Sequence, residues 1–267
     1  MAQQSVNPAA SAADPVSAAV LSPDASLFIR QILQSALANA AGSPSPPAWV
    51  PDAQALLANV LMNDYLNWWN NAGQNELTAA QNAVSQAGDS ALATHARGLI
   101  YRATGQPNLA LKEFKKAKEA DSGFARAHAQ FGNQKAALAR EDETQDPLDK
   151  AIQLSPHHPA RGYFYWGKGR AYFQQEDWSN AIECLQESVN ELPTVWYNRC
   201  YLAAAQDQSS DTATKAKARQ TFRDFVDLFG KDTLVRAVAS LQYPTGPATV
   251  AKARTTVHDF LAQQPVP

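Results

Sequence analysis

A sparse pattern of small and aromatic residues occurs three times in this chain at a regular spacing. Gly132 lies 34 residues after Gly98, and Ala151 lies 34 residues after Ala117. A further copy begins 71 residues after the first, with Gly169, Tyr172, Ala181 and Leu185 in the places of Gly98, Tyr101, Ala110 and Phe114. A unit of this length cannot bury its apolar face alone, so the spacing predicts a stack of repeated units around a shared core.

The residue types indicate how each unit packs. Glycine at one position and alanine at another let two packed helices approach closely. Gly98 and Ala110 serve this purpose in the first copy, and the neighbouring aromatic residues fill the remaining space. Pro156 and Pro193 follow second helices and end them, since proline cannot continue a helix.

The pattern resembles the tetratricopeptide repeat over about residues 51–229, most specifically from Ala91 to Pro193. The resemblance implies an all-α fold, a right-handed α-solenoid of tetratricopeptide-type helix pairs with C-terminal capping helices. The clear repeats are Ala91–Asp121, Ala125–Ser155 and Gly162–Leu192. The middle repeat departs from the family pattern at Lys135, where an aromatic is usual, and at Thr144, where alanine is usual. We therefore expect a looser turn there.

The chain divides into four parts. Residues 1–22 are rich in alanine, serine and proline and are expected to form a flexible tail. Residues 23–47 form a leading helix and a proline-rich link, residues 48–229 the repeat array, and residues 230–267 the capping helices. The leading helix carries an apolar stripe that we expect to dock on the first repeat: Leu27, Phe28, Ile32, Leu33 and Leu37.

Charge and hydropathy exclude several classes of function. The formal net charge of −2 and pI of about 6.2 argue against a general nucleic-acid or anionic-membrane binder. No stretch approaches the roughly 18 apolar residues of a membrane span. Residues 1–19 lack the basic and apolar regions of a signal peptide, which favours a cytoplasmic location. A chain trimmed after a signal or anchor would look the same, so a periplasmic location stays open.

Signals of catalysis, metal binding or cofactor binding are weak. The sequence has no nucleophile elbow, phosphate loop or dinucleotide fingerprint. Cys184 and Cys200 give neither a disulfide framework nor a metal-ligand spacing. The adjacent His157 and His158 fit a solvated turn better than a metal site. We therefore predict a chain that is not an enzyme and needs no cofactor.

The resemblance implies that the first helices line a concave groove that binds an extended peptide or a helix of a protein partner. Matching positions give nine candidate groove residues: His95, Arg102, Arg126, Asn133, Tyr163, Trp166, Arg170, Phe173 and Tyr197. Arginine pairs with carboxylates, asparagine holds a peptide backbone, and aromatic rings take an apolar anchor. The alternative interpretation makes Tyr163, Trp166 and Phe173 part of the core between repeats.

The three arginines of this set are expected on one concave face as exposed charges, where charge reversal leaves the fold intact. Two hypotheses of function follow. In the first, the chain is a scaffold or adaptor in a multiprotein assembly. In the second, it regulates a separate catalytic protein such as a nucleotide cyclase, because residues 157–202 are similar to repeat regions attached to bacterial class III cyclases.

Overall fold

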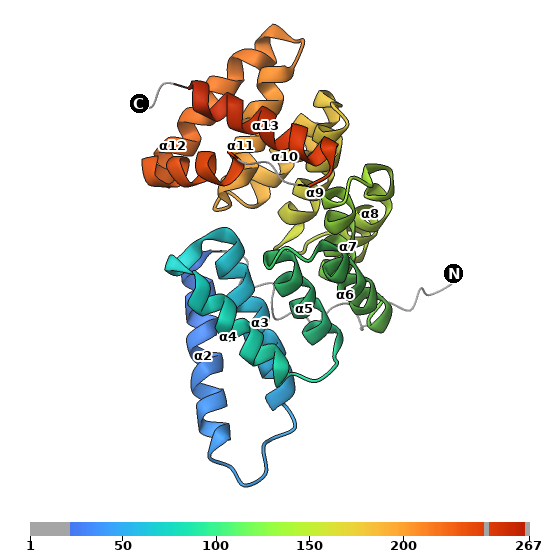
Figure 1. Ribbon diagram of the computed structural model, residues 1–267, viewed down its shortest axis with the longest axis vertical. Coiled ribbons are helices and arrows are strands. Elements are labelled where there is room, and N and C mark those ends of the chain that lie inside the picture. The colour runs from blue at the N-terminus through green and yellow to red at the C-terminus, as the bar shows by residue number, and fades with distance from the viewer. Residues whose placement is uncertain (1–21, 243–245, 265–267) are drawn as a thin grey trace, which may run out of the picture.

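The protein is all-helical over the residues described by its computed structural model, 22–242 and 246–264 (Figure 1). This part of the chain contains no strand, and the predicted all-α solenoid is confirmed. The expected flexible tail lies outside the described residues except for Ser22. The α-helices are α2 (Pro23–Ala41), α3 (Val50–Asn67), α4 (Gln74–Ser85), α5 (Ala91–Ala103), α6 (Pro107–Ala120), α7 (Ala125–Ala137), α8 (Gln145–Leu154), α9 (Arg161–Gln174), α10 (Trp178–Glu191), α11 (Trp196–Gln208), α12 (Thr212–Leu241) and α13 (Ala248–Gln263).

Consecutive helices pack as pairs, and each pair packs on the next. The pairs are α3 with α4, α5 with α6, α7 with α8, α9 with α10, and α11 with α12. Short 3-10 turns, η1 (Trp69–Asn71) and η2 (Glu141–Glu143), lie between the helices of the first and third pairs. The odd-numbered helices from α3 to α11 are therefore the first helices on which the groove residues were expected.

Glycine permits the close crossing of paired helices, as the spacing predicts. A Cβ atom on Gly98 would lie 2.5 Å from Cε1 of Phe114, and one on Gly169 would lie 2.7 Å from Cγ of Leu185. Phe114 and Leu185 are fully buried. The side chain of the second helix thus occupies the space that a glycine on the first helix leaves free.

Ion pairs connect the two ends of the turn between α7 and α8, whereas the sequence led us to expect a loosely packed turn. Lys135 and Arg140 both form ion pairs with Glu143, and they lower the pKa of that carboxyl to about 2. The ammonium of Lys135 also lies 4.9 Å from the centre of the Phe131 ring. Lysine at this position therefore replaces an aromatic contact with an ion pair and a cation–π contact.

The leading helix α2 packs on α3 along only part of its stripe. Ser22 caps its first turn by accepting a hydrogen bond from the Ala25 N–H, and Leu33 and Leu37 join the core of the first two pairs. Phe28 and Ile32 remain 64% and 52% exposed. The docking expectation therefore holds for the C-terminal half of the stripe and fails for Phe28 and Ile32.

The C-terminal helices cover the last pair, as expected of a cap. Gly230 has a non-helical backbone, with a φ of 79° and a ψ of 167°, and divides α12 into two helical stretches, so the helix that precedes it stops there as expected. Beyond it, α13 packs against α11 and α12, and Phe260 meets Phe222 edge to face.

The first pair touches the fourth, which local spacing did not predict. The helix α3 ends at Asn67, because Trp68 adopts a left-handed conformation with a φ of 59°. The Trp68 ring then stacks on Trp196 at 4.3 Å, and Trp69 is buried against Leu192. The array curls until the α3–α4 connection meets the α10–α11 connection, as Figure 1 shows.

Candidate functional site

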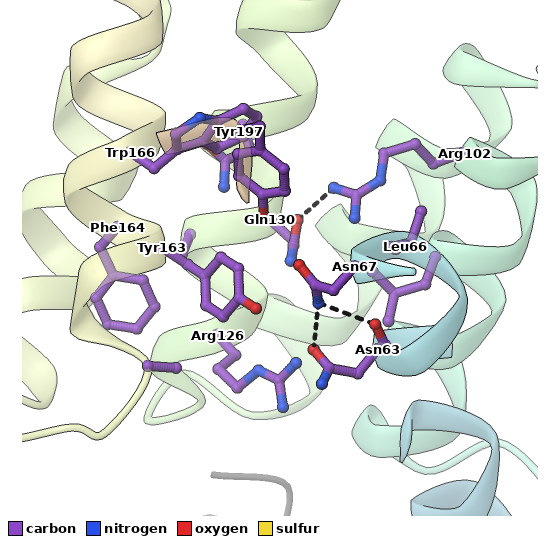
Figure 2. A pocket seen from close by; sticks show the side chains of 14 residues that line it. Asn63, Leu66, Asn67, Arg102, Arg126, Gln130, Tyr163, Phe164, Trp166 and Tyr197 are labelled. Carbon is purple, nitrogen blue, oxygen red and sulfur yellow. Dashed lines mark hydrogen bonds between the residues drawn. The ribbon is translucent and has the colours of Figure 1, made fainter. Parts of the chain in front are cut away.

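A small polar pocket lies inside the curve, enclosed by first helices of successive pairs. Its volume is about 40 Å³, enough for a few water-sized groups. The polar and aromatic side chains that line it come from α3, α5, α7, α9 and α11: Asn63, Asn67, Arg102, Arg126, Gln130, Asn133, Tyr163, Phe164, Trp166 and Tyr197. Figure 2 shows these side chains converging from opposite walls.

Six of the nine expected groove residues line this pocket, namely Arg102, Arg126, Asn133, Tyr163, Trp166 and Tyr197. A seventh, Arg170, lies directly behind them. Its guanidinium stacks over the Trp166 ring at 4.6 Å and donates a hydrogen bond to the backbone carbonyl of Asn133. The structure thus gathers the three arginines around one asparagine and one tryptophan.

His95 and Phe173 do not line the pocket and belong to the core. The His95 side chain is fully buried, with Nδ1 2.6 Å from Oδ1 of Asn59 and its ring tilted against Phe114. Phe173 is 1% exposed and meets Trp178 edge to face. Both residues face a neighbouring helix. Their spacing along the helix did not show whether they face that helix or the groove.

The arginines are not the exposed charges that the sequence suggested. Arg126 is 5% exposed, and burial lowers the pKa of Arg102 to about 10, with the nearby Arg170 and Arg126 guanidinium groups adding to this effect. Burial also lowers the pKa of Arg170. The expected exposure of these arginines is wrong for Arg126, and Arg102 and Arg170 are half-buried. Charge reversal at Arg126 would therefore leave a buried charge without a partner, which is costly.

The pocket is lined by positively charged side chains and, among the described residues, by no negatively charged one. Arg102 donates from Nη1 to the Gln130 amide oxygen at 2.6 Å. The Trp166 indole Nε1 and the Arg170 Nε are buried and have no hydrogen-bond partner among the described residues. Burial raises the pKa of Tyr163 and Tyr197, so both phenols stay neutral, and the two side chains interact with each other.

Asparagines on α3 complete the pocket and were missed from the sequence. Asn59, Asn63 and Asn67 stand four residues apart, and Asn67 donates from Nδ2 to the Asn63 carbonyl at 2.9 Å. Asn59 is fully buried and donates from Nδ2 to the Leu92 carbonyl. Such a row of amides on the buried face of an apolar helix was the signal available, since buried amides need partners.

Other surfaces of the described residues offer less defined chemistry. A broad outer groove between α12 and α13 is lined by the apolar rings of Phe222 and Phe260 and by exposed basic side chains such as Arg219. Within residues 22–242 and 246–264, no cluster of three or more His, Cys, Asp or Glu side chains could hold a metal ion. No helix in these ranges has both the length and the apolar character to cross a membrane.

Comparison with known proteins agrees with the fold. Residues 93–124, which cover α5 and α6, match the family model of the tetratricopeptide repeat. The structure of pilF from Pseudomonas aeruginosa is similar, with 20% sequence identity over 79% of this chain and 88% of that chain and a TM-score of 0.54. No curated protein sequence matches the chain.

Two weaker likenesses concern other repeat proteins. A tetratricopeptide repeat protein from Parabacteroides merdae is 12% identical over 90% of this chain and 93% of that chain, with a TM-score of 0.47. YrrB, described as a TPR protein with an unusual peptide-binding site, is 18% identical over 74% of this chain and 89% of that chain, with a TM-score of 0.42.

Proposed function

We propose that this chain, which carries a tetratricopeptide repeat at residues 93–124 and folds as a solenoid of such helix pairs, is a non-catalytic scaffold for a protein partner. The partner, an extended peptide or a helix, binds on the concave side. The observation that carries the proposal is the polar pocket, where Arg102, Arg126 and Arg170 from three successive first helices converge with Trp166 and Tyr197.

The size of the pocket defines how a partner is held. A volume of about 40 Å³ cannot take a peptide segment, but it can take the end of one side chain. The rest of the partner then lies on the concave side, outside the pocket. Binding energy is concentrated in a buried anchor near the centre of the contact, which is typical of protein interfaces.

Substitution of single arginines tests this site. Arg102→Gln and Arg170→Gln are each expected to reduce capture of the partner at least tenfold, because each removes a half-buried guanidinium that donates charge-assisted hydrogen bonds. Neutral glutamine is used because charge reversal in a buried site would endanger the fold. The measurement is co-purification from the native organism, quantified by mass spectrometry, for each variant and the wild type.

Lys115→Gln on the outer helix α6 serves as the control, since the Lys115 side chain is 60% exposed and pairs only with the nearby Glu119. It should bind the partner normally. If Lys115→Gln abolishes capture while both arginine variants retain it, the partner uses the convex face and the proposed site is wrong.

The alternative, regulation of a separate nucleotide cyclase, has no structural observation in its favour. The pocket chemistry is that of a protein-side-chain receptor, and the comparisons support the fold alone. The cytoplasmic location predicted from residues 1–19 stays a prediction.

A further inference from the structure

We propose that the outer groove between α12 and α13 binds helix α10 of a second copy of this chain. The groove lies at the C-terminal end of the array and shares no lining residue with the polar pocket on the concave side. Self-association through this groove is therefore independent of the partner binding proposed above.

The groove carries a row of positive charge that its own chain does not neutralise. Lys215, Arg219 and Arg223 stand four residues apart, line the groove from one face of α12, and are exposed. In the described part of the chain none of them forms an ion pair, and Arg223 donates only to the Gln220 amide oxygen at 2.9 Å. One acidic residue, Asp207, also lines the groove. The row thus favours an occupant with negative charge.

The size and lining of the groove indicate a polar occupant. Its volume is about 980 Å³, which is enough for several side chains of a helix. Phe222 and Phe260 line it, but they are only 3% and 5% exposed. The amides of Gln263 and Gln264 lie on the α13 side. Such a surface suits a polar, acidic helix better than an apolar one such as the exposed stripe of α2.

The matching acidic row lies on α10. Glu183, Glu187 and Glu191 repeat the four-residue spacing, and Glu183 and Glu187 are exposed without an ion pair to the described residues. Glu191 pairs with Arg161 of its own chain. Among the described helices, α10 is the one with three acidic residues at this spacing, and α12 is the one with three basic residues. The other exposed residues of α10 are polar and uncharged: Ser179, Asn180, Gln186 and Asn190.

The two rows fit each other in register. Four residues of an α-helix rise about 6 Å, so carboxylates on α10 and cations on α12 coincide whether the helices run parallel or antiparallel. An isolated exposed ion pair contributes little, but several pairs in a groove that excludes water contribute more. The rows do not pair within one chain, and every copy supplies one of each sign. A second copy is therefore the occupant that this charge pattern fits.

Light scattering on the purified chain at several concentrations tests the proposal. In about 50 mM sodium chloride we expect the mass to rise above the 28.9 kDa of one chain as the concentration increases. About 500 mM salt should weaken the association at least tenfold, because it screens the charges across the contact.

Charge exchange identifies the contact. The double variant Glu183→Lys with Glu187→Lys should be monomeric, and so should Arg219→Glu with Arg223→Glu, because like charges then oppose each other. An equimolar mixture of the two variants should associate again, since each supplies the complement of the other. Both pairs of residues are exposed, so circular dichroism should show an unchanged helix content.

Lys112→Glu with Lys115→Glu on α6 is the matched control, since both lysines are exposed and the change in net charge equals that of the arginine variant. It should associate as the wild type does. The proposal is overturned if the wild type stays at the mass of one chain at every concentration, which would leave the groove to an acidic segment of another protein. Association of the charge-reversed variants alone, or none in their mixture, would also overturn it. These results leave the proposed function untouched, because partner capture is tested at Arg102 and Arg170.

Discussion

Gly98→Leu is expected to lower the free energy of unfolding by about 3 kcal/mol or more. The position has no room, because even a Cβ atom there would lie 2.5 Å from Cε1 of the fully buried Phe114 ring. Either the ring must move or α5 and α6 must separate, and both options disrupt the shared core. Gly169→Leu against Leu185 and Ala110→Leu should behave alike. Urea denaturation followed by circular dichroism at 222 nm measures the effect.

The control for this prediction is Gly73→Ala. A Cβ atom on Gly73 would meet nothing within 4 Å, and its φ of −152° is accessible to any residue. Its unfolding midpoint should stay close to that of the wild type. If Gly98→Leu and Gly169→Leu also kept the wild-type midpoint, the assigned contacts between paired helices would be wrong.

Trp69→Ala is expected to cost about 3–5 kcal/mol, the range for removal of a large buried aromatic side chain. Trp69 is 6% exposed and packs with Leu192 and Val195, so its loss leaves a cavity where the first pair meets the fourth. The contact between the α3–α4 and α10–α11 connections should weaken with it. We therefore expect a lower urea midpoint together with a larger radius of gyration by small-angle X-ray scattering.

Trp49→Ala provides the comparison, because Trp49 is 44% exposed just before α3. This substitution should change the free energy of unfolding by less than about 0.5 kcal/mol, as is usual at the surface. Equal stability of the two variants would show that the contact between the first and fourth pairs contributes little to the fold.

The helix pairs were predictable because their causes are local in sequence. Gly98 and Gly169 mark close crossings with partners about 16 residues further on, and the hydrogen-bonding serine at position 22 caps the helix that follows it. The stop at Gly230 depends on a φ of 79°, which glycine adopts at little cost. Each of these features acts over one or two helical turns or one helix pair, so a single sequence reveals it.

The candidate site was predictable only in part. Position within the repeat placed Arg102, Arg126 and Trp166 on the inner wall, because the inner positions of first helices recur with the repeat. The same reasoning also selected His95 and Phe173, which the structure buries in the core. Neighbouring positions on one helix differ by about 100° in direction, and only the packed neighbours decide which of them reaches an open space.

Sequence by itself therefore determined the pairing of helices and part of the set of first-helix side chains that face inward. Only the tertiary structure decided that the inner wall forms a small polar pocket. That outcome depends on the left-handed turn at Trp68, which brings Trp69 against Val195 across more than a hundred residues. The burial that lowers the pKa of Arg102 and Arg170 follows from this contact, because it arises from groups that the curvature of the whole array brings together.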